Sequence, residues 1–302
     1  MECADCEIRF KQSVRRNCAV LLSFYLTVIA GHIRSAAAQN NHEPLTGCTE
    51  VFMHHFFHLR RAAVLACAML LSAAAAFPTA AVQQAEKSDA AANDSPMLAL
   101  TFDDGPSEKN TGRILDVLEA NGAKATFFVI GRNIAPCADV LVRAKKMGCE
   151  IGNHTYDHKK LSDLSGEGIA RQLEKTDEAI EGILGIRPSL VRAPCGRCSA
   201  YVASCLDRPI ILWSIDTRDW EYACSRRGGT PQNRDKIVRS VLEHARDGDI
   251  ILMHDIYSLT ADCVSQIVPK LCEMGFRLVT VSEMMESRRI ELQGGTIYHN
   301  GR

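Results

Sequence analysis

The sequence predicts an α/β fold in which seven strand–helix units form a closed or nearly closed barrel. From residue 97 onward, short apolar runs rich in strand-forming residues alternate with longer segments of helical period. No domain-sized break interrupts this alternation, and no Gly-x-Gly-x-x-Gly follows the first predicted strand. The pattern therefore favours a barrel over an open, doubly wound dinucleotide-binding sheet.

The seven predicted strands are short and apolar. They span approximately residues 98–102, 125–130, 150–152, 190–192, 210–215, 250–253 and 277–281. In barrels of this kind the catalytic groups lie on the loops that follow the strands. Polar residues directly after these runs are therefore the first candidates for a site.

Five helices are predicted between the strands, each with one apolar face. They span approximately residues 110–120, 134–147, 167–184, 234–245 and 259–274. Each ends at or near a glycine, a residue that readily takes the left-handed conformation at a helix end. Pro269, inside the last pattern, predicts a kink or a late start.

The first part of the chain reads as an export leader. Two apolar runs, residues 19–31 and 62–76, each follow paired arginines, and neither reaches the roughly 20 apolar residues that a membrane span needs. We expect a leader over residues 1–81, with translation starting at Met53, and a secreted or extracytoplasmic protein without a stable membrane span. An uncleaved anchor formed by either run is the alternative. A flexible tether over residues 82–96, a catalytic domain over 97–287 and a C-terminal tail over 288–302 complete the predicted organisation.

Composition excludes some classes of function and leaves others open. The 302 residues are 46% hydrophobic, with Lys+Arg 35 against Asp+Glu 36, so no basic footprint indicates a nucleic-acid partner. Eight of the 13 cysteines follow the tether, and an even number behind an export signal predicts disulfides of undetermined pairing. Cys195 and Cys198 have redox or zinc spacing, but no second pair completes a zinc site.

Asp103 and Asp104 follow the first predicted strand and precede Gly105-Pro106. A sharp turn here would point both carboxylates at the barrel mouth, where one could bind a divalent metal and the other could take a proton from water. Taken alone, these residues are equally typical of a solvated turn.

His154 and His158 follow the third predicted strand. On one helical turn, residues four apart aim both imidazoles at a single point, and neutral imidazole is a ligand that zinc prefers. With one carboxylate they would form a His₂Asp site with an open position for water. Without Asp104 this spacing is as often accidental.

Arg192 ends the fourth predicted strand and Asp219 follows the fifth, and we expect a salt bridge between them that holds the general-base carboxylate in place. A purely structural ion pair is the alternative. Trp220 and Tyr222 could stack on a sugar ring, whereas Trp213 lies within a strand and is expected in the core.

His254 ends the sixth predicted strand, where it could protonate a leaving group. Leu252, two residues earlier, shares its face of the strand. Asp255, the next residue, is expected to orient the imidazole. A single histidine at a strand end is more often structural, but here it would complete an acid and a base around a metal.

Five ordered segments closely resemble the motifs of the metal-dependent polysaccharide deacetylases, carbohydrate esterase family four. They are Thr101–Pro106, His154–His158, Arg192–Gly196, Asp216–Trp220 and Leu252–His254. The resemblance covers roughly residues 97–287, and the five motifs in order make it specific.

The resemblance implies a distorted (β/α)₇ barrel and a role for each matched residue. Asp103 would be the base and His254 the acid, with Arg192 and Asp219 holding the base. Asp104, His154 and His158 would bind a divalent metal, most often Zn²⁺, with Co²⁺ among the alternatives. The backbone N–H of Cys195 would stabilise the oxyanion, and Trp220 and Leu252 would line the substrate groove. Cys195 stands where the family commonly has Tyr, a departure that concerns the substrate groove.

The implied activity is removal of N-acetyl groups from N-acetylglucosamine residues in peptidoglycan or chitin-like glycans, with release of acetate. An O-acetyl esterase acting on xylan would use the same residues. A glycan-binding protein without turnover and a redox protein using Cys195 and Cys198 are the alternatives from other classes.

Overall fold

A computed structural model describes residues 95–225 and 229–302. The predicted leader, the Met53 start and all but the last two residues of the predicted tether lie outside the described residues. Within the described ranges, no helix is both long and apolar enough to cross a bilayer.

The centre of the sheet is β1 (Met97–Asp103), which is buried along its whole length. It pairs in parallel with β2 (Thr126–Val129) on one side and with β6 (Ile250–His254) on the other. Further out, β3 (Glu150–Asn153) pairs with β2 and β5 (Ile215–Asp216) pairs with β6. Strands covered on both faces have no polar face, which explains their continuous apolar sequences.

The barrel closes through the extended chain at residues 210–216. Val191 bridges Asn153 and Ile210, and β4 (Ile210–Ile211) therefore continues the sheet beyond β3. The same chain then becomes β5 and pairs with β6, so it joins the two open edges. The predicted fold class, a distorted (β/α)₇ barrel, is confirmed.

The distortion has two sources. First, the side chain of Arg192 donates to the carbonyls of Ile211 and Leu212, groups that a regular ladder would have used, and the predicted strand 210–215 is split in two. Second, β7 (Arg277–Leu278) pairs only with the first two residues of β1, and on the same edge β2 takes over from Thr101 onward, so two short strands share one edge of β1.

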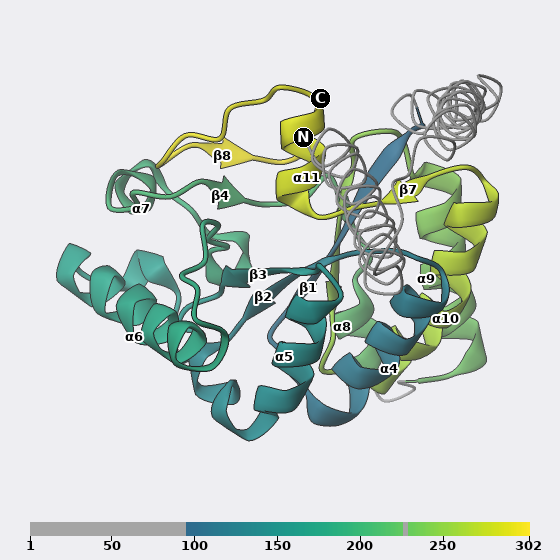
Figure 1. Ribbon diagram of the computed structural model, residues 1–302, viewed down its shortest axis with the longest axis horizontal. Helices are drawn as coiled ribbons and strands as arrows, with labels where there is room; N and C mark the ends of the chain where they lie inside the picture. The colour runs from purple at the N-terminus through teal and green to yellow at the C-terminus, as the bar shows by residue number, and fades with distance from the viewer. Residues whose placement is uncertain (1–94, 226–228) are drawn as a thin grey trace, which may run out of the picture. The chain divides into compact units, whose positions relative to one another are not determined.

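The C-terminal residues belong to this sheet, although the sequence assigned 288–302 to a tail. Strand β8 (Ile297–Tyr298) pairs in parallel with β4, and Asn300 forms an antiparallel bridge with Asp249. Figure 1 shows β8 beside β4, on the side of the fold away from α9 and α10.

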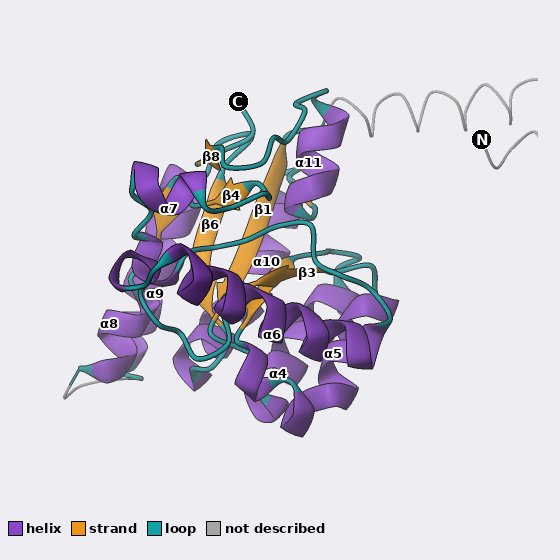
Figure 2. Ribbon diagram, turned by 90° about the vertical axis from the view of Figure 1, so that its left-hand side faces the viewer, coloured by secondary structure: helices purple, strands orange, loops and turns teal. Residues whose placement is uncertain are grey.

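All five predicted helices form, and they surround the sheet in the order α9, α10, α4, α5 and α6 (Figure 1). Their bounds are α4 (Glu108–Ala120), α5 (Ala138–Lys146), α6 (Gly166–Leu184), α9 (Pro231–His244) and α10 (Ser258–Glu273). Figure 2 shows β1 and β6 running side by side with these helices outside them. Of the two outcomes predicted for Pro269, a kink or a late start, the late start is wrong, because α10 begins at Ser258 and continues through Pro269.

Local capping fixes where several helices begin and end. Ser107 accepts from the backbone N–H of Asn110 at the start of α4, and Ser165 does the same for Gly168 in α6. Helix α6 ends at Gly185, whose φ of 65° is the left-handed conformation expected there.

In the described residues, three short α-helices and four 3₁₀ turns were not predicted as such, and one of these turns occupies the start of the predicted helix 134–147. They are α7 (Ala200–Ser204), α8 (Asp219–Cys224), α11 (Val281–Ser287), η1 (Gly131–Asn133), η2 (Ala135–Cys137), η3 (Leu161–Asp163) and η4 (Pro194–Gly196). Helix α11 replaces the end of the predicted strand 277–281 because Thr280 and Glu283 form a capping box there.

The core lies between the strands and the helix ring, with Phe102 and Phe127 stacked at 5.1 Å between ring centroids. Trp213 is partly buried and packs against the cluster that contains Phe128, close to its predicted place in the core. The predicted disulfides are not formed: the eight cysteines after the predicted tether are all free thiols in the described part of the chain.

Candidate active site

The residues predicted to carry chemistry gather at the carboxyl ends of the strands. Asp103 and His254 are opposite each other in the ladder between β1 and β6, so both reach the same end of the barrel. Asp104 then adopts a φ of 73°, which turns the chain sharply after the strand. This turn brings its carboxylate beside that of Asp103 instead of leaving it on the opposite face of the sheet.

Asp104, His154 and His158 converge on one point, and their ligand atoms all lie within 4.8 Å of one another. Asp104 Oδ1 lies 3.5 Å from His154 Nε2 and 3.2 Å from His158 Nε2. This oxygen is buried and has no hydrogen-bond partner. A buried, unpartnered carboxylate oxygen facing two imidazole nitrogens fits a divalent cation, and one carboxylate with two imidazoles is a donor set that zinc accepts.

The two histidines are not on a helix, contrary to the prediction. His154 directly follows β3, and the chain then bends through left-handed conformations at Thr155 and His158, with φ of 66° and 62°. The side chain of Asn153 accepts from the Thr155 N–H at 2.8 Å, and the Thr155 hydroxyl accepts from the His158 N–H at 3.1 Å. These bonds hold a loop that brings together two side chains four residues apart.

Backbone contacts orient the ligands. Nδ1 of His154 donates to the carbonyl of Arg192 at 2.8 Å, which leaves Nε2 free to face the cluster. Burial and the neighbouring charge of His154 lower the pKa of His158, so its neutral, metal-binding form is favoured. Asn133 donates to the carbonyl of Asp104 at 2.8 Å. Asn133 and Asn153 were not predicted from the sequence. They hold the backbone of Asp104 and Thr155 through hydrogen bonds that residue spacing does not indicate.

Asp103 forms a buried ion pair with Arg192, at 2.8 Å between Oδ1 and Nη1. The guanidinium is fully buried and packs over the Phe128 ring at 4.1 Å, and it also donates to the hydroxyl of Thr101. Burial alone would raise the pKa of Asp103, but the charges of Arg192, His154 and His254 lower it below its usual value. Asp103 is therefore an ionised carboxylate beside the metal-binding cluster.

The predicted salt bridge between Arg192 and Asp219 is wrong. Asp219 is completely buried at the start of α8, a helix that packs against β6, and its carboxylate instead faces His254. It accepts from Nδ1 of His254 at 2.8 Å and from the His254 backbone N–H at 2.7 Å. The Trp220 N–H and the Thr260 hydroxyl supply two further donors.

Asp219 rather than Asp255 thus orients the imidazole of His254, so that earlier expectation is also wrong. Burial would lower the pKa of His254, but the hydrogen bond and charge of Asp219, together with the charges of Asp103 and Asp104, raise it to about 9. His254 is protonated at neutral pH and presents Nε2 as a proton donor.

Replacing Asp219 should change this protonation state measurably. In the metal-free protein, Asp219→Asn is expected to lower the pKa of His254 from about 9 toward the ordinary histidine value of about 6.5. An NMR titration of the imidazole signals measures this shift. Asp216→Asn, at an exposed residue of the neighbouring strand, is the matched control and should leave the pKa unchanged. Equal pKa values in the Asp219 variant and the wild type would contradict the role of Asp219.

The three remaining predicted residues lie around this centre in different environments. Leu252 is buried in β6, two residues before His254. Trp220 is 44% exposed, so its ring is available to a ligand, whereas Tyr222 is partly buried against the core. Cys195 is exposed, with a φ of 58°, in the 3₁₀ turn after Arg192.

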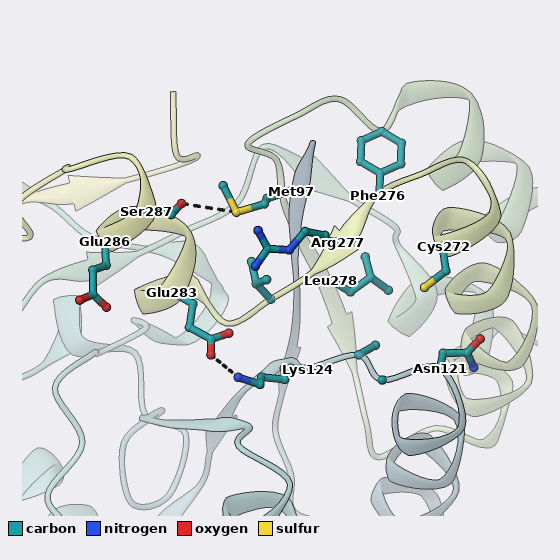
Figure 3. Close-up of a pocket in the computed structure, with 13 residues that line it drawn as sticks. Met97, Asn121, Lys124, Cys272, Phe276, Arg277, Leu278, Glu283, Glu286 and Ser287 are labelled. Carbon is teal, nitrogen blue, oxygen red and sulfur yellow. Dashed lines mark hydrogen bonds and ion pairs between the residues drawn. The ribbon is translucent and has the colours of Figure 1, made fainter. Parts of the chain in front are cut away.

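A separate hollow of about 530 Å³ lies at the other end of the barrel (Figure 3). Met97, the first residue of β1, lines it, together with Arg277 of β7 and an ion pair between Lys124 and Glu283. None of the five sequence motifs contributes to it, so we place the chemistry at the carboxyl ends of the strands.

The fold and this group of side chains define a hydrolase-like α/β barrel with a candidate metal centre at its mouth. A sequence model of the family described as polysaccharide deacetylase matches residues 90–208. The chain belongs to the polysaccharide deacetylase family, carbohydrate esterase family four.

Three relatives show the range of the family. The peptidoglycan-N-acetylmuramic acid deacetylase PdaC of Bacillus subtilis is 37% identical over 70% of this chain, which spans only 44% of that relative. The peptidoglycan-N-acetylglucosamine deacetylase of Bacillus cereus is 32% identical over 64% of this chain and 69% of its own length. The structure of a family 4 acetyl xylan esterase from Clostridium thermocellum with a cobalt ion matches with a TM-score of 0.62 and 27% identity, over 68% of this chain and 98% of that one.

Proposed function

We propose that this protein is an exported, metal-dependent deacetylase that hydrolyses the N-acetyl group of N-acetylglucosamine residues in peptidoglycan or chitin-like glycans and releases acetate. One observation carries the proposal: Asp104, His154 and His158 converge on a single point, with an ionised Asp103 and a protonated His254 beside it. The deacetylase names of two relatives support the reaction class. Export rests on the two apolar runs that follow paired arginines.

The metal would be held by Asp104 Oδ1 and the Nε2 atoms of His154 and His158. A divalent cation at this point supplies Lewis-acid chemistry, which polarises an acetyl carbonyl and makes water more acidic. Zn²⁺ is the proposed metal, and the cobalt ion in the Clostridium thermocellum relative makes Co²⁺ a useful substitute in experiments.

Asp103 is proposed as the general base. Its carboxylate is ionised and is held at one oxygen by Arg192, and its other oxygen lies 3.6 Å from His154 Nε2, beside the metal-binding cluster. This position allows it to accept a proton from the water that attacks the acetyl carbon. Arg192 keeps the carboxylate directed at that water and keeps it charged.

His254 is proposed as the general acid. Its Nδ1–H group donates a hydrogen bond to the Asp219 carboxylate, so the proton on Nε2 is the one available to the departing amine. The backbone N–H of Cys195 is proposed to stabilise the developing oxyanion, Leu252 to form an apolar wall beside the acetyl methyl group, and Trp220 to stack on a sugar face.

An O-acetyl esterase is the second candidate, because a structural relative is an acetyl xylan esterase and the same side chains would serve both reactions. The identity of the acetylated sugar is also open to test, since one relative is named for N-acetylmuramic acid and another for N-acetylglucosamine. Cys195, in place of the more common Tyr, is a local difference in the groove that could affect this choice.

Acetate release distinguishes these functions. The full chain is expected to release acetate from peptidoglycan or N-acetylated chitin oligomers, to lose this activity on treatment with a chelator, and to regain it on addition of Zn²⁺. Analysis of the sugars from digested peptidoglycan identifies which one has lost its acetyl group. Acetate from acetylxylan alone would favour the esterase, and zinc-loaded protein that binds glycan without releasing acetate would favour a binding role.

A further inference from the structure

Asp255 is a fully buried carboxyl group that the proposed reaction does not use. Its Oδ2 accepts from the hydroxyl of Thr111 in α4 at 2.5 Å, while its Oδ1 is buried without a hydrogen-bond partner. The carboxyl group lies directly against Gly105: a Cβ on that glycine would be 2.3 Å from both oxygens. Asp255 therefore lies immediately behind the turn that carries Asp104.

This turn holds a demanding conformation. Asp104 has a φ of 73°, which a residue with a Cβ adopts only where its surroundings impose it. On one side, Asn133 donates to the Asp104 carbonyl and the N–H of Ile130 donates to the Gly105 carbonyl, each at 2.8 Å. These two bonds hold the carbonyl groups of Asp104 and Gly105. They do not involve the side of the turn that faces Asp255.

Thr111 and Asp255 contact the turn on that side. The Thr111 hydroxyl accepts from the backbone N–H of Ser107 at 2.8 Å and donates its own proton to Asp255. One hydroxyl therefore links the end of the turn to the carboxyl group that packs on Gly105. The backbone from Asp104 to Ser107 is held between Asn133 and Ile130 on one side and the Thr111–Asp255 pair on the other.

We propose that Asp255 is a positioning residue that acts through Gly105 and Thr111 to hold Asp104 in its metal-binding orientation. This inference rests on the proposed function, because it takes Asp104 as a metal ligand. Asp255 is not one of the three side chains whose ligand atoms converge. Its effect is to fix one ligand before the metal arrives, which raises metal affinity because less ordering of the chain remains to be done on binding.

Substitutions at Thr111 test the link with little change in volume. Thr111→Val removes the hydroxyl and is expected to weaken Zn²⁺ binding by tenfold or more, measured by competition with a chelator, and to alter the visible spectrum of the Co²⁺-loaded protein. Thr111→Ser keeps the hydroxyl and should retain wild-type affinity and spectrum. Asp255→Ala should behave as Thr111→Val does, and Asp255→Asn, which can still accept from Thr111, should recover most of the affinity.

Ile114→Val is the control for loss of stability alone, since Ile114 is a buried core residue of the same helix. It should lower the unfolding temperature of the metal-free protein without changing Zn²⁺ affinity. If Thr111→Val also lowers only the unfolding temperature, Asp255 is merely structural and the proposal is wrong. Should Asp255→Ala fail to fold, the comparison of Val and Ser at Thr111 decides. Metal affinity is measured without glycan. A result that contradicts the role of Asp255 is therefore distinct from a failure of the protein to release acetate, which would contradict the proposed function.

Discussion

Asp103→Asn is expected to bind Zn²⁺ at wild-type stoichiometry and to lose turnover by a factor of about 10² to 10⁴, the usual contribution of a positioned general base. The amide has nearly the same shape as the carboxylate and can still accept from Arg192, but it cannot take a proton from water. His154→Ala should instead lose the metal, because it removes one of three converging ligand atoms. Zinc content and the rate of acetate release, measured on the same preparations, separate the two effects.

Asp116→Asn is the matched control, since Asp116 is an exposed carboxylate on α4 that pairs with Arg143. Neither its zinc content nor its rate should change. A fall in zinc content that is equally large in the Asp103 and His154 variants would show that both residues are ligands, and the division between base and ligand would then be wrong.

The sequence predicted well those features that depend on local pattern. Buried parallel strands show as apolar runs, so the positions of Asp103, His154 and His254 at strand ends could be predicted without knowledge of the fold. Because the carboxyl ends of barrel strands share one face, their convergence followed as well. The helices with a strong apolar face were also found, to within a few residues at their ends.

The partner of Asp219 could not be found in this way. It depends on α8, a six-residue helix too short to show a period, and on the packing of that helix against β6. The sequence interpretation paired Asp219 with Arg192 and expected Asp255 to orient His254, and only three-dimensional packing places Asp219 against His254. Asp255, although it directly follows His254 in sequence, faces Thr111 and Gly105 instead.

The loop between His154 and His158 shows a related limit. A spacing of four residues predicts a helical turn, but Thr155 and His158 adopt left-handed conformations, which are uncommon outside glycine and especially so for the β-branched Thr155. Asn153 and the Thr155 hydroxyl hold this backbone through bonds within the loop. The convergence was expected for the wrong geometric reason, since the loop and not a helix brings the two imidazoles together.

Arg192→Met is expected to lower the free energy of unfolding by about 3–5 kcal/mol, the usual cost of removing one partner of a buried ion pair. Asp103 would be left charged and buried, and the carbonyls of Ile211 and Leu212 would lose donors that no water can easily replace. Urea unfolding of the metal-free protein measures this change, and the metal-free state keeps zinc affinity out of the comparison.

The double variant separates the ion pair from the carbonyl contacts. The loss of stability in Arg192→Met can come mainly from leaving the buried charge of Asp103 without a partner. In that case adding Asp103→Asn should restore part of the lost stability, because burying a neutral amide alone costs far less free energy. If the loss comes mainly from the carbonyls of Ile211 and Leu212, the effects of the two substitutions on the free energy of unfolding should be additive. Arg192 would then stabilise the fold chiefly through its hydrogen bonds to the split strand. The first outcome is expected, because the charge of Arg192 lowers the pKa of Asp103 although that carboxylate is buried. It would mean that the residue that stabilises the barrel interior also keeps the base ionised.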